Sequence, residues 1–116
     1  MERDSALSES DPSICIAYSK MYVGAEDDIP ITEAFIRSAF SRYGDIANVA
    51  MIPHFTAGLP RRRVEDYYRV IIHFNRWNVE NGEARYVRSV LMSNSPNANI
   101  KLSYSGPWYW KFSANR

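Results

Sequence analysis

Residues 32–51 read TEAFIRSAFSRYGDIANVAM, and their apolar period changes once, from helical to extended. The first half carries an apolar stripe at helical spacing, made of Ile36, Ala39, Phe40 and Tyr43. Thr32 can cap the amino end of this helix, and Glu33 complements the positive end of its dipole. The stretch therefore predicts an amphipathic helix near residues 32–43.

The second half of the stretch predicts a strand. Gly44 follows the last periodic residue, where a left-handed conformation that ends a helix is cheapest for glycine. After it the period becomes two, with Val49 and Met51 on one face, and Pro53 ends the run.

The same stretch resembles the first helix and second strand of an RNA recognition motif. That family reads T-E-x-x-L-x-x-x-F-S-x-Y-G-x-I-x-x-V-x-I, and it is matched in order by Thr32, Glu33, Ile36, Phe40, Ser41, Tyr43, Gly44, Ile46, Val49 and Met51. The resemblance implies an α+β chain with the ferredoxin-like βαββαβ order. A four-stranded antiparallel sheet would carry both helices on one face, and its other face would hold single-stranded RNA on aromatic rings.

The remaining segments fit that order. The run ICIAYSKMYVG would supply the first strand, with MYVGAE in the place of the family's first-strand hexapeptide. YYRVIIHF alternates strictly and predicts the third strand, with Val70 and Ile72 on one face and Arg69 on the other. Ala84, Val87 and Leu91 lie at helical spacing and predict the second helix near residues 80–92. IKLSY predicts the fourth strand. We accordingly expect a disordered acidic leader over residues 1–13, a domain over 14–104 and an aromatic tail over 105–116.

Composition limits the possible classes of protein. A chain of 116 residues with 46% hydrophobic content suits one core, and no apolar run approaches the ~20 residues of a membrane helix. Without a signal-peptide core or a second cysteine beside Cys15, we expect a soluble intracellular protein without disulfides. Residues 1–30 hold two basic and seven acidic groups, a net charge of −5, whereas the rest carries +6. A basic domain of this kind is compatible with nucleic-acid binding.

Candidate contacts to single-stranded RNA or DNA lie on the predicted sheet face and one loop. Tyr22 takes the place of the family's first-strand ring, but the third strand has Arg69 and Ile71 where stacking rings usually stand, so the platform is degenerate. The full set of candidates is Lys20, Tyr22, Asn48, Arg61, Arg62, Arg63, Tyr67, Arg69 and Lys101. The three consecutive arginines suit phosphate contact, and a plain solvated loop is the alternative.

The tail SGPWYWKFSANR supports a second hypothesis. Trp108, Tyr109 and Trp110 must be buried somewhere: on the domain's own surface, as a fifth edge strand, or against a protein partner. The W-Y-W alternation predicts that both tryptophans lie on one side of a strand. With HFNRW, the tail also resembles small RRM-like proteins of nucleocytoplasmic large DNA viruses, which implies no activity. The alternative function is thus a protein-interaction or virion-structural module.

The sequence gives little support to an enzyme. His54 and His73 have no nucleophile motif or phosphate-binding glycine loop beside them, so no catalytic residue is predicted. Glu26, Asp27 and Asp28 lack further oxygen ligands at fixed spacing, so no metal is predicted either. We expect no cofactor, no small-molecule substrate and no membrane contact.

Overall fold

A computed structural model describes residues 11–24, 26, 29–55, 66–93, 99–105 and 108–115. In chain order the main elements are β1 Ile14–Lys20, α2 Glu33–Phe40, β4 Gly44–His54, β5 Tyr67–Trp77, α3 Gly82–Met92, β6 Ile100–Ser105 and β7 Trp108–Ala114. A two-stranded sheet of β2 Tyr22–Val23 and β3 Ile29–Pro30 precedes α2, and a 3-10 turn, η1 Ser41–Tyr43, follows it.

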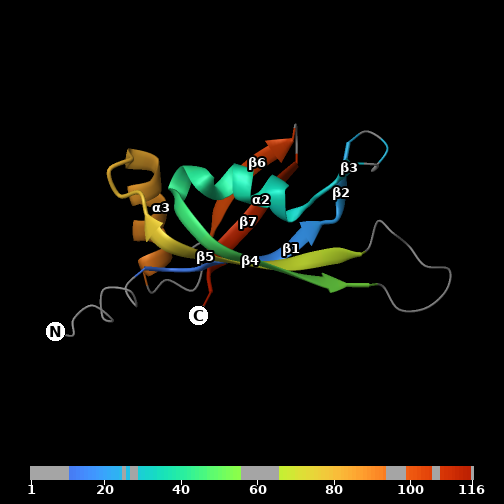
Figure 1. The fold of residues 1–116 in the computed structure, drawn as a ribbon, viewed down its shortest axis with the longest axis horizontal. Helices are drawn as coiled ribbons and strands as arrows, with labels where there is room; N and C mark the ends of the chain where they lie inside the picture. Colours follow the sequence, from blue (N-terminus) through green and yellow to red (C-terminus); the bar gives the residue numbers. More distant parts are fainter. Residues whose placement is uncertain are drawn as a thin grey trace.

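The main sheet has five strands in the order β4-β5-β1-β7-β6, and every pairing is antiparallel. Both helices lie on the same side of it (Figure 1). The α+β class, the antiparallel sheet and the two helices were predicted correctly. The prediction of four strands is wrong, because the tail forms β7 and lies between β1 and β6 rather than beyond the last strand.

The helices begin and end where their caps allow. The Thr32 side chain accepts a hydrogen bond from Phe35 N, and the Asn81 side chain accepts one from Ala84 N. These bonds satisfy backbone donors that the first turn of a helix leaves unpaired. Three residues of the predicted stripe are buried, with Ile36 and Phe40 wholly inaccessible and Tyr43 only 1% exposed, and Ala39 is partly buried against them.

Gly44 differs from its predicted role as a left-handed helix stop. Its φ of 163° is extended backbone, and it is the first residue of β4. A Cβ here would lie 2.3 Å from the Arg76 carbonyl oxygen and 2.8 Å from Trp77 Cα. Glycine is therefore required by the close approach of β5, not by backbone handedness.

The core lies between the helices and the sheet. Trp110 and Phe112 of β7 are each 1% exposed and pack on Phe40, with ring centroids 5.2 and 5.3 Å away. From the other strands the core takes Ile14, Ile16, Val49, Val70, Ile72 and Leu102. The tail thus supplies two of the largest buried side chains.

Residues 11–13, assigned above to the leader, contact the domain in the structure. Arg88 Nε donates to Asp11 Oδ1 over 3.1 Å, Trp77 Nε1 donates to Pro12 O over 3.0 Å, and Ser13 Oγ lies 2.7 Å from His73 Nδ1. These contacts connect the start of β1 to α3 and β5. Residues 11–13 therefore pack on the domain, and residues 1–10 of the expected leader lie outside the described residues.

Candidate nucleic-acid interface

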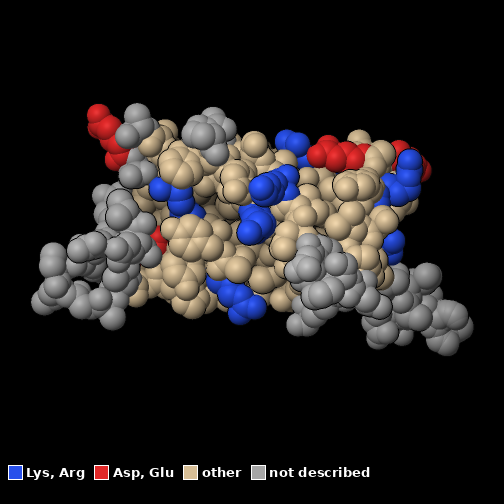
Figure 2. All heavy atoms as spheres, turned by 180° about the vertical axis from the view of Figure 1, so that it is seen from behind, with Lys and Arg blue, Asp and Glu red and all other residues tan. Residues whose placement is uncertain are grey.

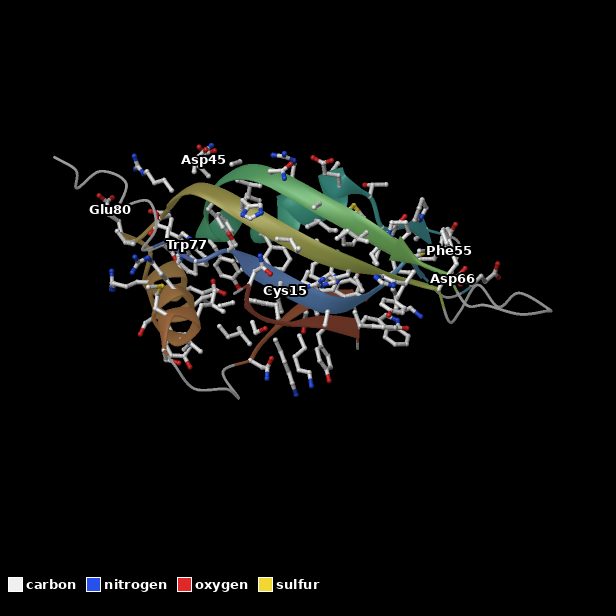
Figure 3. The ribbon with its side chains drawn as sticks, turned by 90° about the horizontal axis from the view of Figure 1, so that it is seen from below. Cys15, Asp45, Phe55, Asp66, Trp77 and Glu80 are labelled. Carbon is white, nitrogen blue, oxygen red and sulfur yellow. The ribbon has the colours of Figure 1, made fainter. Side chains whose placement is uncertain are left out.

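The helix-free face of the sheet carries a row of three rings. Tyr67 on β5 pairs with His54 on β4, and these two rings are parallel, with centroids 4.8 Å apart and planes inclined by 4°. Tyr18 on β1 stacks on Tyr67 with a centroid distance of 4.9 Å. Phe55 and Asp66, the neighbours of His54 and Tyr67 in sequence, lie together at one end of the sheet in Figure 3. We call Tyr18, Tyr67 and His54 the ring row.

A β-bulge turns Tyr18 toward this face. Ile16 pairs with Val70 and Ser19 with Tyr68, so Ala17 and Tyr18 together oppose the single residue Arg69. Strict alternation would direct Tyr18 into the core beside Ile16. The extra residue reverses the phase, and Tyr18 is consequently 51% exposed while Ser19 is buried.

Beyond the bulge, β1 and β7 diverge and leave a groove. Their pairing ends at Ile16 and Phe112. From there Lys20 pairs only with β5, while β7 continues against β6 as far as Trp108. The groove has a volume of about 450 Å³ and is lined by Ala17, Tyr18, Lys20, Tyr104, Trp108, Tyr109 and Lys111.

The core side of the groove is closed by stacked aromatic rings. The Tyr104 ring stacks on Trp110 at 4.2 Å, and Trp110 Nε1 donates a buried hydrogen bond of 3.0 Å to Ser19 Oγ. Burial, and secondarily the nearby Tyr18, raises the pKa of Tyr104 above its ordinary value. Its hydroxyl therefore stays protonated at neutral pH and can donate a hydrogen bond.

Three lysines surround the groove. Lys20 Nζ lies 4.5 Å from the centroid of the Trp108 ring, and Lys101 Nζ lies 5.0 Å from that of Tyr109. Lys111 pairs with Lys101 and lines the groove. None of the described residues that line it is acidic. Seen from behind, Lys and Arg side chains lie near the middle of the molecule and also at its edges, and the acidic side chains in view lie toward the margins (Figure 2).

Five of the predicted contact residues lie on the helix-free face. Tyr67 belongs to the ring row. Arg69 is exposed on β5 and pairs with Ile52 of β4, and Asn48 is exposed on β4 and pairs with His73 of β5. Lys20 and Lys101 lie at the groove, as described above.

The predicted placement of Tyr22 on this face is wrong. The first strand of the sheet is Ile14–Lys20, so Cys15, not Tyr22, lies near the centre of the face, opposite Ile71 and Ser113. Figure 3 shows Cys15 in the middle of the sheet. Tyr22 pairs with Pro30 in the separate small sheet. The error arose because ICIAYSK and MYVG are both apolar runs, and the resemblance was fitted to the second. Arg61, Arg62 and Arg63 lie outside the described residues.

The three aromatic residues of the tail have different environments. Trp110 is buried, whereas Trp108 is 43% and Tyr109 48% exposed. Trp108 pairs with Ser105, beyond the last β7 residue that pairs with β1, and it lines the groove. That both tryptophans share one side of the strand stays a prediction.

The prediction missed Tyr18, His54 and Lys111. His54 continues the outward alternation of Asn48 and Ile52, so extending that pattern beyond Pro53 would have found it. Lys111 shares the phase of Tyr109 in WYWKF and could have been found likewise. Tyr18 had no such signal, because a bulge is not visible in the sequence pattern.

Neither helix in the described part of the chain is long and apolar enough to cross a membrane. Within the same residues, no three His, Cys, Asp or Glu side chains are grouped so that they could hold a metal ion. Comparisons with protein-family models, with curated proteins and with solved structures each gave no match.

Proposed function

We propose that this protein is a single-stranded nucleic-acid-binding module that uses the helix-free face of its sheet. The observation that carries the proposal is the ring row ending beside a groove that three lysines surround. Tyr18 is half-exposed, and Lys20, Lys101 and Lys111 place positive charge within one or two strands of it. Rings and cations on one face match the two needs of an unpaired strand, stacking for bases and charge for phosphates.

The ring row can extend a stack only at its ends. Tyr67 has stacked neighbours on both sides, Tyr18 at 4.9 Å and His54 at 4.8 Å, so both of its faces are covered. Within the part of the chain that the structure describes, no further ring stacks on the outer faces of Tyr18 and His54, and we propose that bases stack there. Each stacked base contributes ~1 to 3 kcal/mol, whatever its identity.

The finer fold assignment supports the same proposal. If β6 is set aside, the order β1, α2, β4, β5, α3, β7 and the sheet order β4-β5-β1-β7 match the ferredoxin-like arrangement. We infer that β7 takes the part of the fourth strand and that β6 is an added edge strand. The face expected to bind RNA in that arrangement is the one that carries the ring row.

The proposal is tested by measuring affinity for a single-stranded 12-mer RNA at several salt concentrations, by fluorescence anisotropy with the full chain. Replacement of Lys20, Lys101 and Lys111 by glutamine should weaken binding and flatten the salt dependence by about two log units per decade of salt, since each phosphate contact on a single strand contributes ~0.7.

A matched control removes the same charge from the helix side. Arg37 on α2, Arg42 on η1 and Arg85 on α3 are exposed or nearly so and lie away from the groove. The triple glutamine variant of these arginines should keep the original salt slope. If both triple variants flatten the salt dependence of RNA affinity equally, the effect comes from net charge alone. If the original chain shows no salt-dependent binding, the proposed function is refuted.

A further inference from the structure

The groove continues the ring row. Tyr18 belongs to both: Tyr67 covers one face of its ring, and the residue also lines the groove on the side of β7. Tyr109 and Trp108 lie across the groove and are about half exposed. A planar group that enters the groove would therefore stack on Tyr18 and lengthen the row from three rings to four. The volume of about 450 Å³ is within the range of about 300 to 1,000 Å³ that pockets for small organic groups have.

The side chains of the groove are mainly hydrogen-bond donors. The ammonium groups of Lys20 and Lys111 and the indole N–H of Trp108 only donate. The phenols of Tyr18, Tyr104 and Tyr109 donate as well and are its only side-chain acceptors, because its described lining includes no carboxylate or side-chain amide. Such a lining suits an edge of carbonyl oxygens better than an edge with an amino group.

Among the common bases, only uracil and thymine have no exocyclic amino group. Cytosine and adenine each present an amino group on the pairing edge, and guanine carries one at N2. An amino group that enters a donor-rich groove would leave N–H groups poorly paired, which lowers affinity.

We propose that the groove between β1 and β7 is a base-selective subsite, which takes one unstacked uracil or thymine and discriminates against cytosine. This subsite rests on the proposed nucleic-acid function. The base stacks on Tyr18, its carbonyl oxygens accept from the phenol and ammonium groups of the groove, and Lys101 contacts a flanking phosphate.

Oligo(U) and oligo(C) make the sharpest pair of probes, because their bases share size and shape and differ where a carbonyl replaces an amino group. Labelled U10 and C10 RNA are titrated with the full chain at pH 7.5. We expect U10 to bind about fivefold more tightly, the ratio that one net hydrogen bond of about 1 kcal/mol gives. T10 DNA should behave as U10 does if the subsite reads the base alone, and weaker binding of T10 would show that the ribose hydroxyl is also read.

Two single variants locate the discrimination. Tyr109→Ala removes one wall of the groove and should bring the U10 to C10 ratio close to one. His54→Ala, at the far end of the ring row, should weaken both probes and leave the ratio unchanged. Far-UV circular dichroism verifies that each variant is folded.

The tryptophans report occupancy in the unaltered chain. Trp77 Nε1 donates to Pro12 O, Trp110 Nε1 donates to Ser19 Oγ, and Trp108 lies at the groove. Addition of U10 should shift the indole N–H resonance of Trp108 in a ¹⁵N correlation spectrum and leave that of Trp77 in place.

Three results would overturn the subsite: equal affinity for U10 and C10, a ratio unaffected by Tyr109→Ala, or an unmoved Trp108 resonance at saturation. In each of these cases the chain still binds single strands, so the proposed function stands. Failure of all oligonucleotides to bind would remove both proposals together and would leave a protein segment as the occupant of the groove.

Discussion

Trp110 and Trp108 are the same residue type two positions apart on one strand, and the structure predicts very different costs for their removal. Trp110 is 1% exposed, and its ring lies 4.2 Å from Tyr104 and 5.2 Å from Phe40. Truncation to alanine should cost about 3 to 5 kcal/mol of unfolding free energy through the lost burial and the cavity left behind. The lost hydrogen bond to Ser19 adds about 1 kcal/mol.

Trp108→Ala is the matched control. Its ring is 43% exposed and has a cation–π contact with Lys20, so we expect a loss of about 1 to 2 kcal/mol. Urea unfolding at 25 °C, followed by far-UV circular dichroism, gives both values from the shift in midpoint at constant slope.

Equal losses from the two variants, or a loss below about 2 kcal/mol for Trp110→Ala, would show that β7 is not an inner strand of the sheet. A small domain has only about 5 to 15 kcal/mol of stability in total, so Trp110→Ala could leave no folded protein to unfold. In that case Trp110→Phe provides the measurement, with an expected loss of about 1 to 2 kcal/mol.

Two further predictions concern single positions. Gly44→Ala should destabilise the domain by about 3 kcal/mol, because the new Cβ would meet the backbone of Arg76 and Trp77. A Cβ at Gly82 would meet no atom within 4 Å, so Gly82→Ala should stabilise α3 by up to about 1 kcal/mol. The same urea assay measures both changes. For Tyr43, burial first and the Glu83 carboxylate second raise the pKa to about 12, against the opposing effect of Arg42. The unfolded chain releases this proton near pH 10, whereas the folded chain keeps it until about pH 12. The free energy of unfolding should therefore fall by about 2 to 3 kcal/mol between pH 10 and 12. The urea midpoints measured at pH 9 and pH 11 should differ less in the Tyr43→Phe variant than in the original chain.

Local chemistry made much of the fold predictable. Thr32 caps α2 as expected, and the buried residues of α3 are Ala84, Val87 and Leu91, the apolar face that the spacing indicated. The alternation of YYRVIIHF placed Val70 and Ile72 in the core and left Arg69 outside. In each case the signal lies within about ten residues of the chain, where helical and extended periods differ clearly.

Strand order and register were not predictable, because they depend on contacts far apart in sequence. IKLSY and WYWKF are both plausible neighbours of β1, and the choice of the second follows from the fit of Trp110 and Phe112 against Phe40. The bulge at Ala17 and Tyr18 likewise appears only when β1 is laid against β5. The outward position of Tyr18 depends on the bulge, and the groove depends on the place of β7 beside β1. Neither could therefore be predicted from the sequence.

The groove is part of the packed fold, and its closure would break a buried hydrogen bond between β7 and β1. If β1 and β7 paired beyond Ile16 and Phe112, the gap between them would disappear, but Ser19 would no longer lie opposite the indole of Trp110. Trp110 thus stabilises the core and holds the two strands apart at once. A cleft fixed by buried packing loses little conformational freedom when it is filled, so its selectivity depends on the donors that line it. Under the proposed function, the lysines around it would contact the phosphates of any single strand, whereas the groove would distinguish one base from another.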